Sequence, residues 1–213
     1  MLFVVESGRN PNGGRMHGLR LAARGFFLHS CLFLLWCAGP AHSAEDVSVE
    51  ATWRDEALEV VCRALVDAPL ELVWQTLTDY GRLAEFIPGM RQSRLVERRG
   101  AVAVVEQTGD AGFLIFRFPI EVTIESTERP PHSLEARMLK GNLKRLEGAY
   151  RLEPRAGGRI LLTWTGVIEA LSMPPLLGEL VMRSNIEDQF RGMVQEIDRR
   201  QALRRAREGE KKQ

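Results

Sequence analysis

Four polar residues have side chains that could bind or protonate an enol or carbonyl oxygen: Glu106, Arg117, Glu121 and Tyr150. Arg117 and Glu121 alternate with the apolar residues of their segment, so a strand would place them on the face opposite the apolar one. We therefore interpret these two as solvated cross-strand residues. No catalytic residue is assigned from the sequence.

Histidine and cysteine, the residues most often used as bases, nucleophiles and metal ligands, are concentrated near the amino terminus. Beyond residue 43 only His132 and Cys62 remain, and Cys62 lies at an apolar position of an alternating segment. The same part of the chain has no G-x-G-x-x-G, G-x-x-x-x-G-K-[ST], H-E-x-x-H, G-x-S-x-G or C-x-x-C motif. The sequence therefore predicts no metal site, no cofactor and no internal disulfide.

Residues 1–43 have the features of an export signal. Three basic residues precede an apolar segment at 25–38, GFFLHSCLFLLWCA, which is short for a bilayer-spanning helix. Small residues follow, and we expect cleavage near Ser43 or Ala44, giving a periplasmic or secreted protein. An uncleaved membrane anchor is the alternative, and Met16 is a second candidate start.

The remaining chain is long enough for one domain, which we place at residues 44–200. Its charge is close to neutral, which gives no reason to expect nucleic acid as a partner. Residues 201–213 form a basic tail that could touch anionic lipid headgroups transiently. The alternative is a solvated helix end.

Hydrophobic periodicity outlines the secondary structure. Residues 57–66 alternate as a half-buried strand, with Cys62 in the core, and two short helices follow before Ile87-Pro88-Gly89. From Ser93 to Ala170 one strand follows another. A long helix is expected from Pro174 to Arg200, with Glu196 among its solvated residues. This order predicts an α+β fold with an antiparallel meander.

Residues 66–90, VDAPLELVWQTLTDYGRLAEFIPGM, carry a resemblance. With the elements from 58 to 200, this stretch resembles the START-like (SRPBCC) superfamily, in particular its polyketide cyclase/dehydrase and lipid-transport branch, which includes coenzyme-Q-binding proteins. The resemblance implies a helix-grip fold: a curved antiparallel sheet of about seven strands wrapped on a long C-terminal helix, with two short helices after the first strand. It also implies a cavity between sheet and helix, with access near residues 86–90.

The resemblance and the strand alternation together nominate large side chains as cavity residues, each with core packing as the alternative. They are Trp74, Tyr80, Phe86, Ile87, Pro88, Met90, Phe116, Phe118, Ile120, Met138, Trp164, Leu180 and Phe190. The expected partner is a hydrophobic small molecule: a lipid, an isoprenoid quinone or a polyketide-like compound. Two alternatives stay open, namely a cyclase or dehydratase on the same fold, and an interaction module whose interior is filled.

Overall fold

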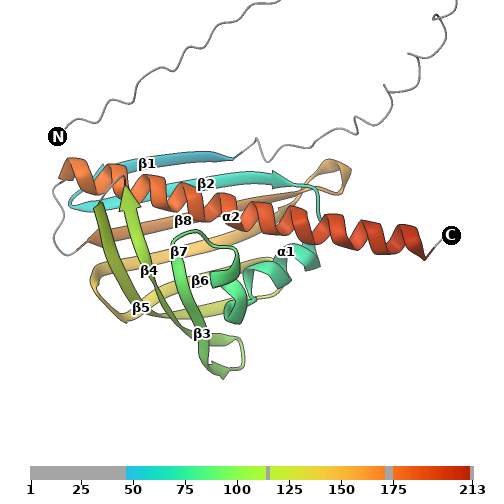
Figure 1. Ribbon diagram of the computed structural model, residues 1–213, viewed down its shortest axis with the longest axis horizontal. Helices are drawn as coiled ribbons and strands as arrows, with labels where there is room; N and C mark the ends of the chain where they lie inside the picture. Colours follow the sequence, from blue (N-terminus) through green and yellow to red (C-terminus); the bar gives the residue numbers. More distant parts are fainter. Residues whose placement is uncertain (1–46, 114–115, 171–174, 212–213) are drawn as a thin grey trace, which may run out of the picture. The chain divides into compact units, whose positions relative to one another are not determined.

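The architecture of the chain is one antiparallel sheet with a long helix lying across it (Figure 1). The computed structural model describes residues 47–113, 116–170 and 175–211. The sheet order is β1-β2-β8-β7-β6-β5-β4-β3. The elements are β1 (Ser48–Arg54), β2 (Ala57–Val66), α1 (Leu70–Leu77), η1 (Tyr80–Glu85), β3 (Met90–Arg99), β4 (Val102–Phe113), β5 (Phe116–Arg129), β6 (Ser133–Gly141), β7 (Leu143–Pro154), η2 (Ala156–Gly158), β8 (Ile160–Ala170) and α2 (Pro175–Glu210).

This architecture confirms the predicted α+β helix-grip fold, with one correction to the strand number. Within the described residues the sheet has eight strands rather than about seven, because β1 adds an edge strand that pairs with β2 from Ser48↔Arg63 to Arg54↔Ala57. Its apolar residues Val49, Ala51 and Trp53 alternate but are only half-buried. An edge strand with so little buried surface gives a weak sequence signal.

The alternating residues predicted for β2 form the centre of the core. Cys62 is 0 % exposed, and its neighbours on the same face are also buried: Leu58, Val60, Ala64 and Val66. Strand β8 pairs with β2 from Leu58↔Ile168 to Val66↔Ile160, and the buried side chain of Leu162 joins the same layer. Burial of one face on each strand fixes the pairing register, because a one-residue slip would expose that face.

The connection from β2 to β3 closes one side of the molecule. Strand β2 lies next to one edge of the sheet and β3 forms the other edge, so α1 and η1 must cross between them. The register of the sheet shifts within β3, between β5 and β6 near Thr123, and between β7 and β8 near Leu143. Such irregularities bend strands and increase the twist of a sheet, which gives this one its curvature (Figure 1).

Helix α2 covers the concave side of the sheet through residues at three- and four-residue spacing, as the sequence predicted: Ile186, Phe190, Met193, Val194 and Ile197 are buried. The helix extends beyond the expected end at Arg200 and reaches Glu210, so residues 201–210 are its last turns rather than a separate tail. An ion pair of 3.0 Å joins Arg205 to Asp67, and Arg204 pairs with Glu208 one turn on.

The export prediction concerns residues 1–43, which lie outside the described residues together with 44–46. Across the described ranges, no helix is both long and apolar enough to cross a membrane.

Candidate functional site

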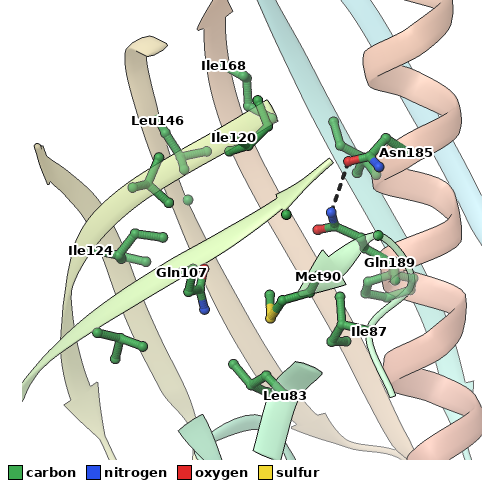
Figure 2. Close-up of a pocket in the computed structure, with 18 of the residues that line it drawn as sticks. Leu83, Ile87, Met90, Gln107, Ile120, Ile124, Leu146, Ile168, Asn185 and Gln189 are labelled. Carbon is green, nitrogen blue, oxygen red and sulfur yellow. Dashed lines mark hydrogen bonds between the residues drawn. The ribbon is translucent and has the colours of Figure 1, made fainter. Parts of the chain in front are cut away.

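A cavity of about 250 Å³ lies between the sheet and α2 (Figure 2). Its walls come from the inner faces of β4 to β8, from η1 and the following loop, and from α2. Apolar side chains dominate, including Leu83, Ile124, Leu146, Ile168 and Met182. A concave apolar site with a few polar groups is the usual form of a small-molecule pocket.

Six of the residues nominated from the sequence line this cavity: Tyr80, Ile87, Met90, Ile120, Trp164 and Phe190. They come from η1, its following loop, β3, β5, β8 and α2, so elements that are far apart in the chain meet around one cavity. The side chains of two further nominated residues, Phe116 and Leu180, lie outside the described residues.

The other five nominated residues do not belong to the lining. Trp74 is 7 % exposed and packs in the core from α1, and Met138 packs half-buried against that core. Phe86 instead lies beneath the Arg200 guanidinium, 5.5 Å from its ring centre. Pro88 faces Gly192 of α2, and Phe118 is half-buried on β5 near its hairpin with β4. All five are large and apolar; Trp74 is buried, Phe86, Phe118 and Met138 are half-buried, and Pro88 is exposed.

Glycines hold the loop at residues 86–90 close to the sheet and to α2. A Cβ atom on Gly109 would lie 2.4 Å from the Gly89 carbonyl oxygen, and one on Gly192 would lie 2.5 Å from Pro88 Cδ. Gly89 itself has a φ of +77°, which L side chains rarely adopt. The Asp110 amide then donates a 2.8 Å hydrogen bond to the Gly89 carbonyl. The loop is therefore seated in contact with β4 and α2.

Two more glycines set the position of the Trp164 ring. Gly148 and Gly166 are opposite each other on β7 and β8, on the inner face that Trp164 shares. A Cβ on Gly166 would lie 2.4 Å from Trp164 Cη2, and one on Gly148 would lie 3.0 Å from its Nε1. The indole therefore lies over the two glycines, with the Tyr150 ring centre 6.5 Å away.

The cavity lining includes three amide side chains, in addition to the hydroxyl-bearing residues Thr108, Ser126 and Tyr150. Gln107 projects from β4, and Asn185 and Gln189 project one turn apart from α2 (Figure 2). Gln189 Nε2 donates a 2.9 Å hydrogen bond to Asn185 Oδ1. The sequence analysis missed all three, although Gln107 is in phase with the buried residues Ala103 and Val105 and thus carried a readable signal.

The described part of the lining contains no lysine, arginine or histidine. Its one carboxylate, Asp110, is paired with Arg91 at 3.4 Å. Tyr80 contributes its ring to the wall, while its hydroxyl donates a 2.9 Å hydrogen bond to the buried Glu128, which also accepts from Arg98 at 3.0 Å. The cavity is therefore apolar with a neutral polar wall.

Burial and the bond to Glu128 raise the pKa of the Tyr80 hydroxyl well above its ordinary value. Burial also raises the pKa of the hydroxyl of Tyr150, another residue of the cavity lining. Both phenols thus stay protonated at neutral pH and can donate a hydrogen bond but cannot remove a proton. Burial likewise raises the pKa of the Cys62 thiol to about 12, so its sulfur is not a nucleophile in the folded protein.

The other candidate acid–base groups lie away from the cavity. Arg117 and Glu121 are exposed, as the sequence analysis predicted, and Glu106 pairs with Arg94 at 2.6 Å outside the lining. His132 is exposed on the β5–β6 turn. Within the described ranges, no group of three or more histidine, cysteine or acidic residues could hold a metal ion.

Glu196 corrects one assignment made from the sequence, because it is 6 % exposed rather than solvated. It accepts hydrogen bonds from Arg199 and Arg200, which lower the pKa of its carboxyl to about 2. Arg200 also donates to Asp79 at 2.8 Å and covers the ring of Phe86. This network joins α2 to the start of η1 and to the loop that borders the cavity.

The sequence matches a family of proteins with known activities. Residues 66–203 match the family described as "Polyketide cyclase / dehydrase and lipid transport", and the chain belongs to this family. The match covers everything from the end of β2 to the last turns of α2. No match was found among curated proteins.

Solved structures with this fold include proteins of both activities that the family description names. The Zhui aromatase/cyclase from Streptomyces sp. R1128 is 18 % identical, with 68 % of this chain and 95 % of that one covered and a TM-score of 0.58. A STAR-related lipid transfer protein from Xanthomonas axonopodis is 12 % identical, covering 71 % and 98 %, with a TM-score of 0.57. A START superfamily protein from Mycobacterium smegmatis is 11 % identical, covering 66 % and 97 %, with a TM-score of 0.54. At these identities the likeness concerns the fold.

Proposed function

We propose that this protein is an exported binder or carrier of a hydrophobic small molecule. The observation that carries the proposal is the apolar cavity of about 250 Å³, whose described lining holds neutral amides and protonated phenols but no basic side chain. The family description couples cyclase and dehydrase activity to lipid transport, and this lining favours transport.

The cavity volume supports a compact ligand group. Because an apolar cavity of about 150 Å³ binds benzene, a cavity of about 250 Å³ has room for one ring with a few further atoms. That is enough for one ring or a short stretch of chain, but not for a whole diacyl lipid. Among a lipid, an isoprenoid quinone and a polyketide-like compound, the part enclosed is therefore a ring or a chain end, and any remainder extends outside.

Hydrophobic burial alone gives such a ligand limited affinity. An aromatic group buries about 150–250 Å², which at about 25 cal/mol per Å² corresponds to about 4–6 kcal/mol. This range spans dissociation constants from about 1 mM to tens of micromolar before the cost of lost ligand freedom. Tighter binding requires the polar wall or contacts outside the cavity.

A cyclase or dehydratase is the second candidate, because the fold is shared with an aromatase/cyclase. Such an enzyme needs a base beside the bound substrate. Tyr150 is the one nominated acid–base residue in the described lining, and the raised pKa of its hydroxyl suits a donor rather than a base. An interaction module with a filled interior is disfavoured by the cavity itself.

Export and membrane contact belong to the same proposal. The signal-like segment at 25–38 supports a periplasmic or secreted location, which fractionation of the native host would test.

The exposed basic end of α2 supports transient docking on anionic lipid, from which a ligand could enter. Replacing Arg204, Arg207 and Lys211 with glutamine should weaken co-sedimentation with anionic vesicles by up to about 100-fold, at about 1 kcal/mol per charge. Unchanged co-sedimentation would remove this role.

The decisive experiment on ligand binding is native mass spectrometry of the protein purified from its own envelope, followed by organic extraction. A stoichiometric apolar compound that leaves on extraction would support the carrier function and identify the ligand class. A protein that is consistently empty, and that also takes up no member of a lipid and quinone panel, would contradict it. Conversion of a bound polyketide-like compound would favour the enzyme.

A further inference from the structure

We propose that the cavity selects ligands with a neutral oxygen-bearing group, a carbonyl or hydroxyl on an apolar skeleton, and rejects carboxylates and phosphates. Gln107, Asn185 and Gln189 are the recognising residues. The proposal rests on the binding function argued above and names the chemical class that the same site accepts.

Gln107 places a neutral amide against an otherwise apolar wall. On the inner face of β4 it follows the buried Ala103 and Val105 and precedes Gly109. Its amide faces the space between Ile124 and Met90 (Figure 2) and has no hydrogen-bond partner among the described residues. A polar group surrounded by apolar side chains is unfavourable unless it is hydrogen-bonded, so a ligand that supplies the partner gains affinity.

Asn185 and Gln189 offer a donor and an acceptor from the opposite wall. Gln189 Nε2 bonds to Asn185 Oδ1, which leaves Asn185 Nδ2 and Gln189 Oε1 without partners in the part of the chain that the structure describes. Exchanging oxygen and nitrogen in both amides again leaves one donor and one acceptor. The pair therefore matches a carbonyl, through the donor, or a hydroxyl, through both.

Anionic ligands find no compensating charge in this cavity. The described lining has no basic residue, and the two nearby arginines are occupied: Arg91 pairs with Asp110 and Arg98 with Glu128. The carboxylate of the lining residue Asp110 is itself held by Arg91, so neither group is free to balance a ligand charge. A buried carboxylate or phosphate would thus lose its hydration without gaining a cation, which is strongly unfavourable.

Three probes of nine non-hydrogen atoms separate these effects: acetophenone (a neutral carbonyl), cumene (its hydrocarbon counterpart) and benzoate (a carboxylate). Their dissociation constants are measured by NMR titration of the ¹⁵N-labelled full chain. We expect benzoate to bind at least tenfold more weakly than acetophenone. Equal binding of benzoate and acetophenone would overturn the proposed rejection of anions.

Variants of similar shape test the amides themselves. Gln107→Met, and the double variant Asn185→Leu/Gln189→Met, should each weaken acetophenone binding by about three- to tenfold for each hydrogen bond lost. Cumene should bind these variants as well as the wild type or better. The control is Gln195→Met, at an exposed position of α2, which should change neither. Unfolding curves and NMR spectra verify that each variant is folded.

The outcomes distinguish failure of this inference from failure of the binding function. Both neutral probes binding, with no loss of acetophenone affinity in either amide variant, would overturn the inference and leave the carrier function intact. No binding of acetophenone or cumene to the wild type, together with an empty native protein, would overturn both.

Discussion

Replacing Gly166 with alanine tests whether the glycines beneath Trp164 define the cavity. The new Cβ would lie 2.4 Å from Trp164 Cη2 and 2.5 Å from Cζ2, whereas ordinary contact begins at 3.4 Å. The indole must therefore move by about 1 Å, and its open side is the cavity that it lines. We expect Gly166→Ala to shrink the cavity and weaken ligand binding without changing the fold.

The size of the effect follows from packing energies. Overpacking a well-packed interior costs about 1–3 kcal/mol, and alanine in a strand recovers about 0.5–1 kcal/mol of backbone entropy relative to glycine. The net loss of stability is therefore about 0–2.5 kcal/mol. If the displaced ring removes room for one methylene of ligand, worth about 0.8 kcal/mol, the affinity for cumene falls about fourfold.

Chemical denaturation measures the stability of this variant, and NMR titration with cumene measures its affinity. Gly81→Ala is the matched control, because a Cβ there meets no atom within 4 Å. It should leave cumene affinity unchanged and should not destabilise the fold, since only the backbone gain of about 0.5–1 kcal/mol applies. Trp164→Leu in the Gly166→Ala background removes the crowded ring atoms and should restore room for cumene. Wild-type affinity in Gly166→Ala, with no gain from the second substitution, would refute the reasoning.

Three further predictions concern ionisable groups. Glu128→Gln should destabilise the fold by about 1–2 kcal/mol in urea denaturation, less than a fully buried pair, because its partner Arg98 is 41 % exposed. The pKa of the Glu196 carboxyl is lowered to about 2 from 4.5, so its contribution to stability is complete above about pH 4.5 and is lost as the pH falls towards 2. Glu196→Gln should therefore lose less stability over that range than the wild type, and an identical loss would contradict the pairing. With a thiol pKa of about 12, Cys62 should resist thiol reagents at pH 8 in the native state and react on unfolding, whereas rapid native labelling would contradict its burial.

The fold could be predicted because its main elements bury one face each. In β2 every second residue from Leu58 to Val66 is buried, and the predicted spacing of α2 matches its contact with the sheet. The predicted ends of elements were less accurate where the residues are no longer buried. Strand β1 is half-buried and was missed. Helix α2 continues past Arg200 through exposed turns, where Arg205 pairs with Asp67, and periodicity gives no signal there.

The cavity was harder to predict, because periodicity identifies which side chains face inward but not which of them border open space. Trp74 and Tyr80 are both buried and aromatic, yet only Tyr80 lines the cavity. Where open space remains depends on contacts between elements distant in sequence, such as that of Gly192 with Pro88, which periodicity does not reveal. Gln107, by contrast, could have been found from the sequence, because it is a polar residue in phase with the buried residues of β4. Such a residue is as good a candidate for the cavity lining as an aromatic one.

The rigidity of the walls explains why this cavity stays open and why a ligand would fill it. A dry cavity costs about 24 cal/mol per Å³, or about 6 kcal/mol for 250 Å³, which approaches the whole stability of many domains. Collapse is prevented because the sheet is continuously paired, glycines seat the 86–90 loop, and Arg200 joins α2 to η1. Water beside the three amides offsets part of the cost, and an apolar ligand with one neutral oxygen can replace that water, keep its hydrogen bond and fill the rest.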